Sequence, residues 1–212
     1  TRAMPLNEFI GNFALLIVGG NDTTRNSMSG GLMALLDNPD QYDKVRANRG
    51  LIPNLVSEII RYHTPVIHMR RTTTRDAELG GKAIPKGSKV VMWYVSGNRD
   101  DEAIADAERF DVERPKVRHH LSFGAGIHRC VGDRLAEMQL RILWDELLQR
   151  DLDRALEIVG PPVRLYSNFI RGIRSLPAGH TQWIDRRGPQ TPRAYWSLVE
   201  TLTRAPAGPA ST

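Results

Sequence analysis

Apolar residues recur at helical spacing over much of the chain and predict four helices. From Asn7 to about Leu36 they fall three or four positions apart, and Asn38-Pro39 stops the pattern, which predicts one long helix. The same reasoning predicts two shorter helices and a later one, over Asp40 to Ala47, Ile52 to Tyr62, and Val131 to Gln149.

The middle of the chain has the pattern of strands and turns instead. Residues 70–74 (RRTTT) and 77–95 (AELGGKAIPKGSKVVMWYV) are rich in β-branched residues, with Gly80-Gly81 and Pro85-Lys86-Gly87 as turns. These segments predict a small sheet, and residues 154–176 predict a hairpin of irregular strands. The fold class expected is therefore mainly α with a small β-sheet (α+β).

Composition allows a globular core over most of the chain. With 212 residues, 41% of them hydrophobic and 25% charged, the chain can bury a core, so general disorder is not expected. After Ala178 the sequence is rich in Pro, Gly, Thr and Arg. We expect residues 1–178 to form one domain and residues 179–212 to be a mostly disordered tail.

Charge, cysteine content and hydropathy narrow the classes of protein further. The net charge of +5 is spread without basic runs, which argues against nucleic-acid binding and favours an acidic protein partner. The longest apolar run, Phe13 to Val18, is far shorter than the roughly 20 residues of a membrane span, so no transmembrane anchor is expected. One cysteine suits a reducing cytoplasm. The start, TRAMPLNEF, has neither an initiator Met nor a leader, and indicates a fragment of a longer chain.

That single cysteine lies in the segment FGAGIHRCVG, residues 123–132. Gly124 and Gly126 allow a tight turn whose backbone comes close to a flat or bulky group, and Gly132 removes a side chain just beyond Cys130. At the start of the following helix, Cys130 is also placed where N–H groups stabilise a thiolate. A thiolate facing a planar ligand is implied, and the alternative is a small buried hydrophobic residue.

The segment resembles the haem-binding loop of the cytochrome P-450 superfamily, Phe-Gly-x-Gly-x-His-x-Cys-x-Gly. The resemblance implies the C-terminal half of that fold and haem b as cofactor, with the thiolate of Cys130 as the axial iron ligand and with Phe123, Gly124 and Gly126 beside it. It also places Arg71, His120 and His128 near the haem propionates. No such assignment falls on His68, which either lines the pocket or is a structural histidine.

Two further motifs of that family occur upstream. In SEIIR, Glu58 and Arg61 share one helical face, and AERF supplies Arg109 as the third charge of the family's structural triad. By itself, a Glu and an Arg at this spacing also fit a solvated surface pair. Their combination with the cysteine loop favours the triad.

The other motif is GGNDTT, residues 19–24, inside the long first helix. Each glycine costs a helix about 1 kcal/mol relative to Ala, and Thr23 can divert a backbone carbonyl, so we expect the helix to open locally. Close helix packing at the glycines is the alternative. The resemblance implies a groove that admits dioxygen, with Asp22 and Thr23 as the catalytic residues that relay protons.

Several segments resemble the bacterial branch that hydroxylates medium-chain alkanes and fatty acids at the terminal carbon. A monooxygenase of this kind inserts one atom of dioxygen into a C–H bond of a small apolar substrate, and an inactive haem-binding fragment without a closed pocket is the alternative. A ferredoxin-type electron donor would dock near Arg129, Arg134 and Arg141, which otherwise form a solvated helix face. The substrate-pocket candidates, each of which could instead be ordinary core, are Leu15, Leu16, Val18, Gly19, Val66, Ile67, Met69, Phe169 and Ile170.

Overall fold

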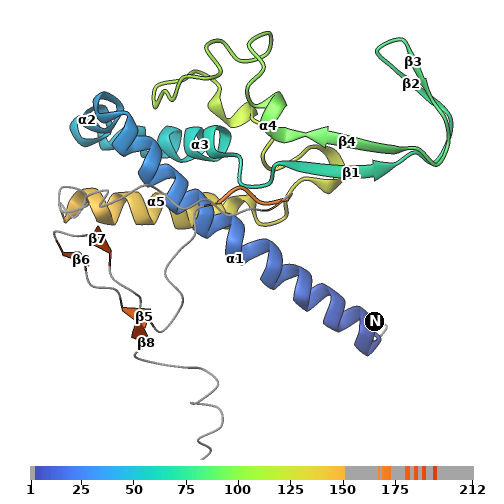
Figure 1. Ribbon diagram of the computed structural model, residues 1–212, viewed down its shortest axis with the longest axis horizontal. Coiled ribbons are helices and arrows are strands. Elements are labelled where there is room, and N and C mark those ends of the chain that lie inside the picture. The colour runs from blue at the N-terminus through green and yellow to red at the C-terminus, as the bar shows by residue number, and fades with distance from the viewer. Residues whose placement is uncertain are drawn as a thin grey trace, which may run out of the picture. The chain divides into compact units, whose positions relative to one another are not determined.

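The structure is a computed structural model (Figure 1). It describes residues 3–150, 167, 169–172, 180–181, 184–185, 188–189 and 193–194. Its contacts divide into two compact units. The first comprises Thr1–Asp153 and Arg164–Ile173, and the second comprises Arg154–Val163 and Arg174–Thr212. Each unit is described by itself below.

The predicted helices of the first unit are present, each within two residues of the predicted bounds. The helices are α1 (Leu6–Asp37), α2 (Pro39–Ala47), α3 (Ile52–His63), α4 (Tyr94–Gly97) and α5 (Asp133–Gln149), and single 3₁₀ turns cover Arg49–Leu51, Val117–His119 and Gly126–His128. Helix α1 ends where Nδ2 of Asn38 donates to the carbonyl of Ala34 at 2.8 Å. Pro39 then opens α2 at a position where its missing N–H costs nothing.

The hydrophobic core lies where α3 meets the C-terminal half of α1 and α5. Leu55, Val56 and Ile59 of α3 are fully buried, as is Trp144 of α5. At Gly31 of α1, an added Cβ would lie 2.6 Å from Cδ1 of Ile59 and 3.0 Å from the Trp144 ring. The three helices therefore approach so closely that only glycine fits at this crossing.

The N-terminal half of α1 has a different environment. In Figure 1 this helix, in blue, extends away from α3 and α5 toward its N-terminus. Its large apolar side chains are more than half exposed, from Leu6 at 73% to Val18 at 62%. The pattern that predicts the helix is therefore satisfied by packing only over its second half.

The strands form two antiparallel pairs in the first unit. Strand β1 (His68–Thr72) pairs with β4 (Lys89–Trp93), and β2 (Ala77–Leu79) pairs with β3 (Lys82–Ile84). Gly80 and Gly81 join β2 to β3 with φ of +58° and +74°, as a two-residue hairpin turn requires. These strands and helices confirm the predicted class, mainly α with a small β component.

Residues 169–171 pair with residues 65–67, just before β1, although about 100 positions separate the two segments. The N–H of Ile67 donates to the carbonyl of Phe169 at 3.1 Å, and Val66 bridges Ile170. Most of the hairpin predicted over residues 154–176 lies outside the described residues.

The described residues of the second unit form four strands of two residues each. Strand β5 (His180–Thr181) pairs with β8 (Arg193–Ala194), and β6 (Ile184–Asp185) pairs with β7 (Gly188–Pro189). Most of the tail from 179 to 212 lies outside the described residues, so the division at 178 and the disorder of the tail stay predictions. Among the residues that the structure describes, no helix is long and apolar enough to cross a membrane.

Candidate functional site: the cysteine loop and its surroundings

The segment that carries Cys130 folds back on itself in a tight loop. Gly124 and Gly126 have φ of +69° and +66°, a region that residues with a side chain rarely adopt. The N–H of Cys130 donates to the carbonyl of Phe123 at 2.8 Å, and the N–H of Arg129 donates to that of Gly126 at 3.0 Å. These bonds hold Cys130 at the surface, where it is exposed. An exposed position contradicts the alternative of a small buried hydrophobic residue.

Two expectations about this loop need correction. Helix α5 begins at Asp133 with Gly132 as its N-cap, so Cys130 lies two residues before the cap and outside the first turn. A Cβ on Gly132 would lie 3.9 Å from Sγ of Cys130, which is ordinary van der Waals contact. Absence of a side chain at 132 is therefore not a steric requirement for the thiol. The glycines that the backbone does require are Gly124 and Gly126.

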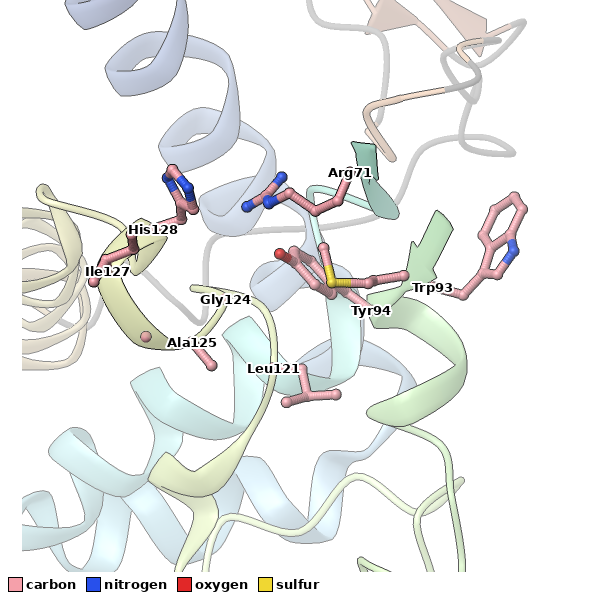
Figure 2. Close-up of a pocket in the computed structure, with 10 residues that line it drawn as sticks. Arg71, Trp93, Tyr94, Leu121, Gly124, Ala125, Ile127 and His128 are labelled. Atoms are coloured by element: carbon pink, nitrogen blue, oxygen red, sulfur yellow. The ribbon is translucent and has the colours of Figure 1, made fainter. Parts of the chain in front are cut away.

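A hollow of about 420 Å³ lies beside this loop, between it and strand β4. Figure 2 shows the guanidinium of Arg71, from β1, and the imidazole of His128 extending toward the same space. The hydroxyl of Tyr94 lies 3.1 Å from the Cβ that any larger residue would place at 124. The lining residues are Arg71, Met92, Trp93, Tyr94, Leu121, Gly124, Ala125, Gly126, Ile127 and His128. The hollow thus joins a bare backbone to basic side chains from two elements, which suits a flat ligand with carboxylates.

His120 does not line this hollow. It is buried, and its ring packs against the ring of Phe123 with centroids 5.3 Å apart. Burial, with the nearby positive charge of Arg129 and then of Arg61 and Arg118, lowers the pKa of His120 to about 4. In this chain the imidazole is therefore uncharged at neutral pH, and its placement near the haem propionates stays a prediction.

Glu58 and Arg61 form a buried ion pair, not a solvated surface pair. Nε and Nη2 of Arg61 donate to the two carboxylate oxygens at 2.7 and 2.8 Å, and both side chains are at most 1% exposed. The second guanidinium on Glu58 is that of Arg114, with Nε 3.2 Å from Oε1. Arg109 contributes its backbone carbonyl, which accepts from Nη2 of Arg61 at 3.0 Å and from Nη2 of Arg114 at 2.6 Å.

The third charge of the triad is therefore Arg114 and not Arg109. Both arginines lie in the same loop segment, ERFDVERP, and neither belongs to a helix or strand. Helical spacing correctly paired Glu58 with Arg61, because i and i+3 share a face whatever else surrounds them. In a loop the direction of a side chain depends on the path of the backbone, and the side chain of Arg109 instead lines a surface hollow with Asp101, Asp106 and Glu108.

The GGNDTT motif lies within an unbroken stretch of α1. Residues 19–24 are all helical, so the expected local opening is not observed. Instead, Oγ1 of Thr23 donates to the carbonyl of Gly19 at 2.8 Å, so the hydroxyl reaches the carbonyl without breaking the helix. The carboxylate of Asp22 accepts from Nη2 of Arg25 at 2.8 Å, and both side chains are about half exposed.

The pocket candidates divide into two sets. Val66, Ile67, Phe169 and Ile170 meet through the backbone pairing described above, and Met69 follows on β1. Leu15, Leu16 and Val18 lie on the exposed half of α1, and an added Cβ at Gly19 would have no atom within 4 Å. The exposed set is therefore not ordinary core in this chain, and the glycine alternative of close helix packing is also contradicted at Gly19.

Basic side chains near the cysteine loop are matched by carboxylates. Arg129 pairs with Asp133 at 3.0 Å, and Arg141 pairs with Glu137 at 3.3 Å. Arg118 donates to both oxygens of Glu137 at 2.9 Å. Arg118 and Arg141 thus share the nearly buried Glu137, and Arg129 and Asp133 form a separate, partly exposed pair.

Sequence reasoning missed Asn98 and Ser122, two buried polar residues between α3 and the cysteine loop. They belong to no periodic pattern, so nothing local marked them. The motif NRD, in which Asn98 follows α4, gave no reason to expect burial.

Comparison with known proteins identifies the family. The family model described as Cytochrome P-450 matches residues 2–150. The linalool 8-monooxygenase of Pseudomonas putida is 48% identical over 175 residues, which are 82% of this chain and 42% of that protein. The methyl-branched lipid omega-hydroxylase of Mycobacterium bovis is 43% identical over 172 residues, covering 80% of this chain and 40% of that protein.

Solved structures agree with this result. Cytochrome P-450-153 from Novosphingobium aromaticivorans matches with a TM-score of 0.77 and 52% sequence identity, over 81% of this chain and 43% of that one. The chain thus spans well under half the length of the relatives it matches. A family model over residues 2–150 and relatives with 43–52% identity show that this chain belongs to the cytochrome P-450 family.

Proposed function

We propose that this chain provides the cysteine side of the haem site of a haem-thiolate monooxygenase. The observation that carries the proposal is the exposed Cys130 on a glycine loop, beside a hollow toward which Arg71 and His128 extend. These residues fit haem b. A bare backbone at Gly124 and Gly126 can lie against a planar macrocycle, and basic side chains from two elements suit its two propionates. Cys130 supplies the only thiol in the sequence.

When bound, a haem with a thiolate ligand supplies the activation of dioxygen, so that one oxygen atom enters a C–H bond and the other leaves as water. The chain's own residues would ligate the iron, bind the propionates and transfer protons. Cys130 donates its thiolate, while Arg71 and His128 hold the propionates. Asp22 and Thr23 offer a carboxyl and a hydroxyl that can hold and pass a proton. Because successive helix residues point about 100° apart, a water would connect the two.

The substrate that we propose is a medium-chain alkane or fatty acid, hydroxylated at its terminal carbon. Support comes from the relative named as a methyl-branched lipid omega-hydroxylase and from the backbone pairing that brings together four apolar residues, Val66, Ile67, Phe169 and Ile170. An alkyl chain offers about 0.8 kcal/mol per buried methylene and no directional contact. Regioselectivity must therefore come from the shape of the channel.

The electron donor that we propose is a ferredoxin-type protein with an acidic surface, docking near Arg129, Arg134 and Arg141. Asp133 and Glu137 already pair with two of these arginines. A docking carboxylate would have to compete with them, so we expect binding to weaken steeply with salt.

A second candidate is an inactive haem-binding fragment. One observation favours it: the N-terminal half of α1, which carries the candidates Leu15 and Val18, is exposed along its length. A pocket wall whose large apolar side chains are more than half exposed is packed too little to position a substrate. Binding of haem with no product formation would support this candidate.

Reconstitution with haem tests the proposal. The reduced, carbon-monoxide-bound protein should show a thiolate-type spectrum, and Cys130→Ser should abolish it, because a serine hydroxyl is not ionised near neutral pH. Val131→Ala, at the exposed neighbour of Cys130, is the matched control and should retain the spectrum. A thiolate-type spectrum in the Cys130→Ser variant would contradict the assignment of the ligand.

A further inference from the structure

The side chain of Asn98, just after α4, lies at the centre of a buried polar network. It is fully buried, and its Oδ1 accepts the N–H of Leu121 at 2.7 Å. Its Nδ2 donates to Oγ1 of Thr64 at 3.0 Å and to Oγ of Ser122 at 2.8 Å. Ser122 in turn donates to the carbonyl of Ile60 at 2.7 Å. One amide thus joins the C-terminal end of α3 to the segment that leads into the cysteine loop.

The network is continuous with the buried ion pairs. Nη1 of Arg61 donates to the backbone carbonyl of Asn98 at 2.7 Å, while Nε and Nη2 of the same guanidinium hold Glu58. Asn98 is therefore held from the backbone side by a group that cannot move without breaking a buried ion pair. Such a fully bonded buried cluster has a single arrangement available to it.

Two backbone hydrogen bonds extend from this cluster to the cysteine. The N–H of Gly124 donates to the carbonyl of Leu121 at 2.7 Å, and the N–H of Cys130 donates to the carbonyl of Phe123 at 2.8 Å. The main chain of Cys130 is thus placed by residues 121–123. Leu121 is in turn held by the Asn98 amide, because its N–H has Oδ1 as the acceptor.

We propose that Asn98 is a positioning residue for Cys130, acting through Leu121 and Phe123. It does not touch the thiol. Its amide fixes the start of the cysteine loop, at Leu121, against the C-terminal end of α3, and so fixes where the thiolate is presented to the haem. The link to haem rests on the function proposed above, whereas the link from Asn98 to the backbone of Cys130 does not.

Amide hydrogen exchange on the 212-residue chain, without haem, tests that link directly. The rates at Leu121 and Cys130 are divided by the rate at Ile59, a fully buried α3 residue, to remove any change in overall stability. Asn98→Ala should raise these ratios roughly tenfold, because the Leu121 N–H loses its buried acceptor.

Ser122→Ala is the matched control. It removes a hydroxyl from the same network but leaves Oδ1 of Asn98 in place for Leu121, so the Leu121 ratio should change much less. Equal changes in the two variants, or wild-type ratios in Asn98→Ala, would overturn the proposal. Should Asn98→Ala fail to fold, Asn98→Asp still presents an oxygen to Leu121. It should keep the Leu121 ratio near wild type, and fast exchange there would count equally against the proposal.

A second measurement uses the haem-loaded chain. Asn98→Ala should lower the fraction of the carbon-monoxide complex with a thiolate-type spectrum, and Ser122→Ala should lower it less. If wild-type protein shows no such spectrum, the proposed function fails, and the exchange experiment still decides the role of Asn98. If the spectrum is present and the same in all variants, the positioning role is wrong and the proposed function stands.

Discussion

Replacing Arg114 by methionine should destabilise the protein strongly, whereas the same change at Arg109 should not. The guanidinium of Arg114 is almost fully buried, lies 3.2 Å from Oε1 of Glu58, and donates from Nη2 to the carbonyls of Asp106 and Arg109 at 3.0 and 2.6 Å. It also donates from Nη1 to the carbonyl of Ala105. Methionine fills part of the space but satisfies none of these acceptors.

The size of the effect follows from what Glu58 retains. Removing one partner of a buried ion pair costs about 3–5 kcal/mol when a charge is left uncompensated. Glu58 keeps both hydrogen bonds from Arg61 and the N–H of Asp111 at 2.9 Å. We therefore expect the low end, about 3 kcal/mol of unfolding free energy for Arg114→Met. The side chain of Arg109 pairs with nothing buried, so Arg109→Met should cost less than about 0.5 kcal/mol.

Urea unfolding followed by circular dichroism measures both values. A double-mutant cycle with Glu58→Gln isolates the pair, and a coupling of at least about 1 kcal/mol is expected for residues in direct contact. A cost at Arg109 equal to that at Arg114, or no coupling between 58 and 114, would refute the reasoning and restore the triad expected from sequence.

Four further substitutions test other parts of the structure. Gly30→Ala should destabilise by about 1–3 kcal/mol, since its Cβ would lie 2.1 Å from Nδ1 of His63. Gly11→Ala, where an added Cβ would have no atom within 4 Å, should instead stabilise the protein by up to about 1 kcal/mol. Thermal unfolding of both variants shows whether packing or helix propensity determines the sign of the stability change at each glycine. Because the pKa of His120 is about 4 when folded against 6.5 for the ordinary group, the unfolded chain binds more protons between these values. The stability that neutral His120 contributes is then present above about pH 6.5. It is lost as the pH falls toward 4, by up to about 3 kcal/mol of unfolding free energy. The variant His120→Gln should therefore flatten the dependence of the urea midpoint on pH. In haem-loaded protein that turns over, Asp22→Asn should leave the thiolate-type spectrum intact and slow product formation by about 10² to 10⁴-fold, and unchanged turnover would rule out Asp22 as the proton relay.

Local pattern was sufficient for four helices and most of the strands, but it missed α4, because Tyr94 and Val95 were expected in a strand. The spacing of apolar residues predicted α1 and α3, and Gly80-Gly81 marked the hairpin turn, because hydrogen bonds within a helix or a tight turn join residues close in sequence. For the same reason the pair of Glu58 and Arg61 could be predicted from a separation of three residues. Gly124 and Gly126 likewise predicted the tight turn of the cysteine loop, since a positive φ is a local property of the backbone.

Residues in loops were harder to assign. Arg109 and Arg114 lie five positions apart in one irregular segment, and only the course of that segment decides which guanidinium turns inward to Glu58. His120 is a second case: its position in the motif does not give its charge, and burial near three arginines makes the neutral form the stable one in this chain. Charge state depends on surroundings that come from other elements.

The sequence by itself determined the four long helices, most of the described strands, the tight turn of the cysteine loop and, through motif resemblance, the family of this protein. Tertiary structure alone decided that Ile67 meets Phe169 across about 100 positions and that the amide of Asn98 holds the N–H of Leu121. The physical reason is that such contacts gain their free energy only after the intervening chain has folded, so no local preference records them. Burial then makes each one specific, because a buried donor or acceptor without a partner costs more than the hydrogen bond contributes.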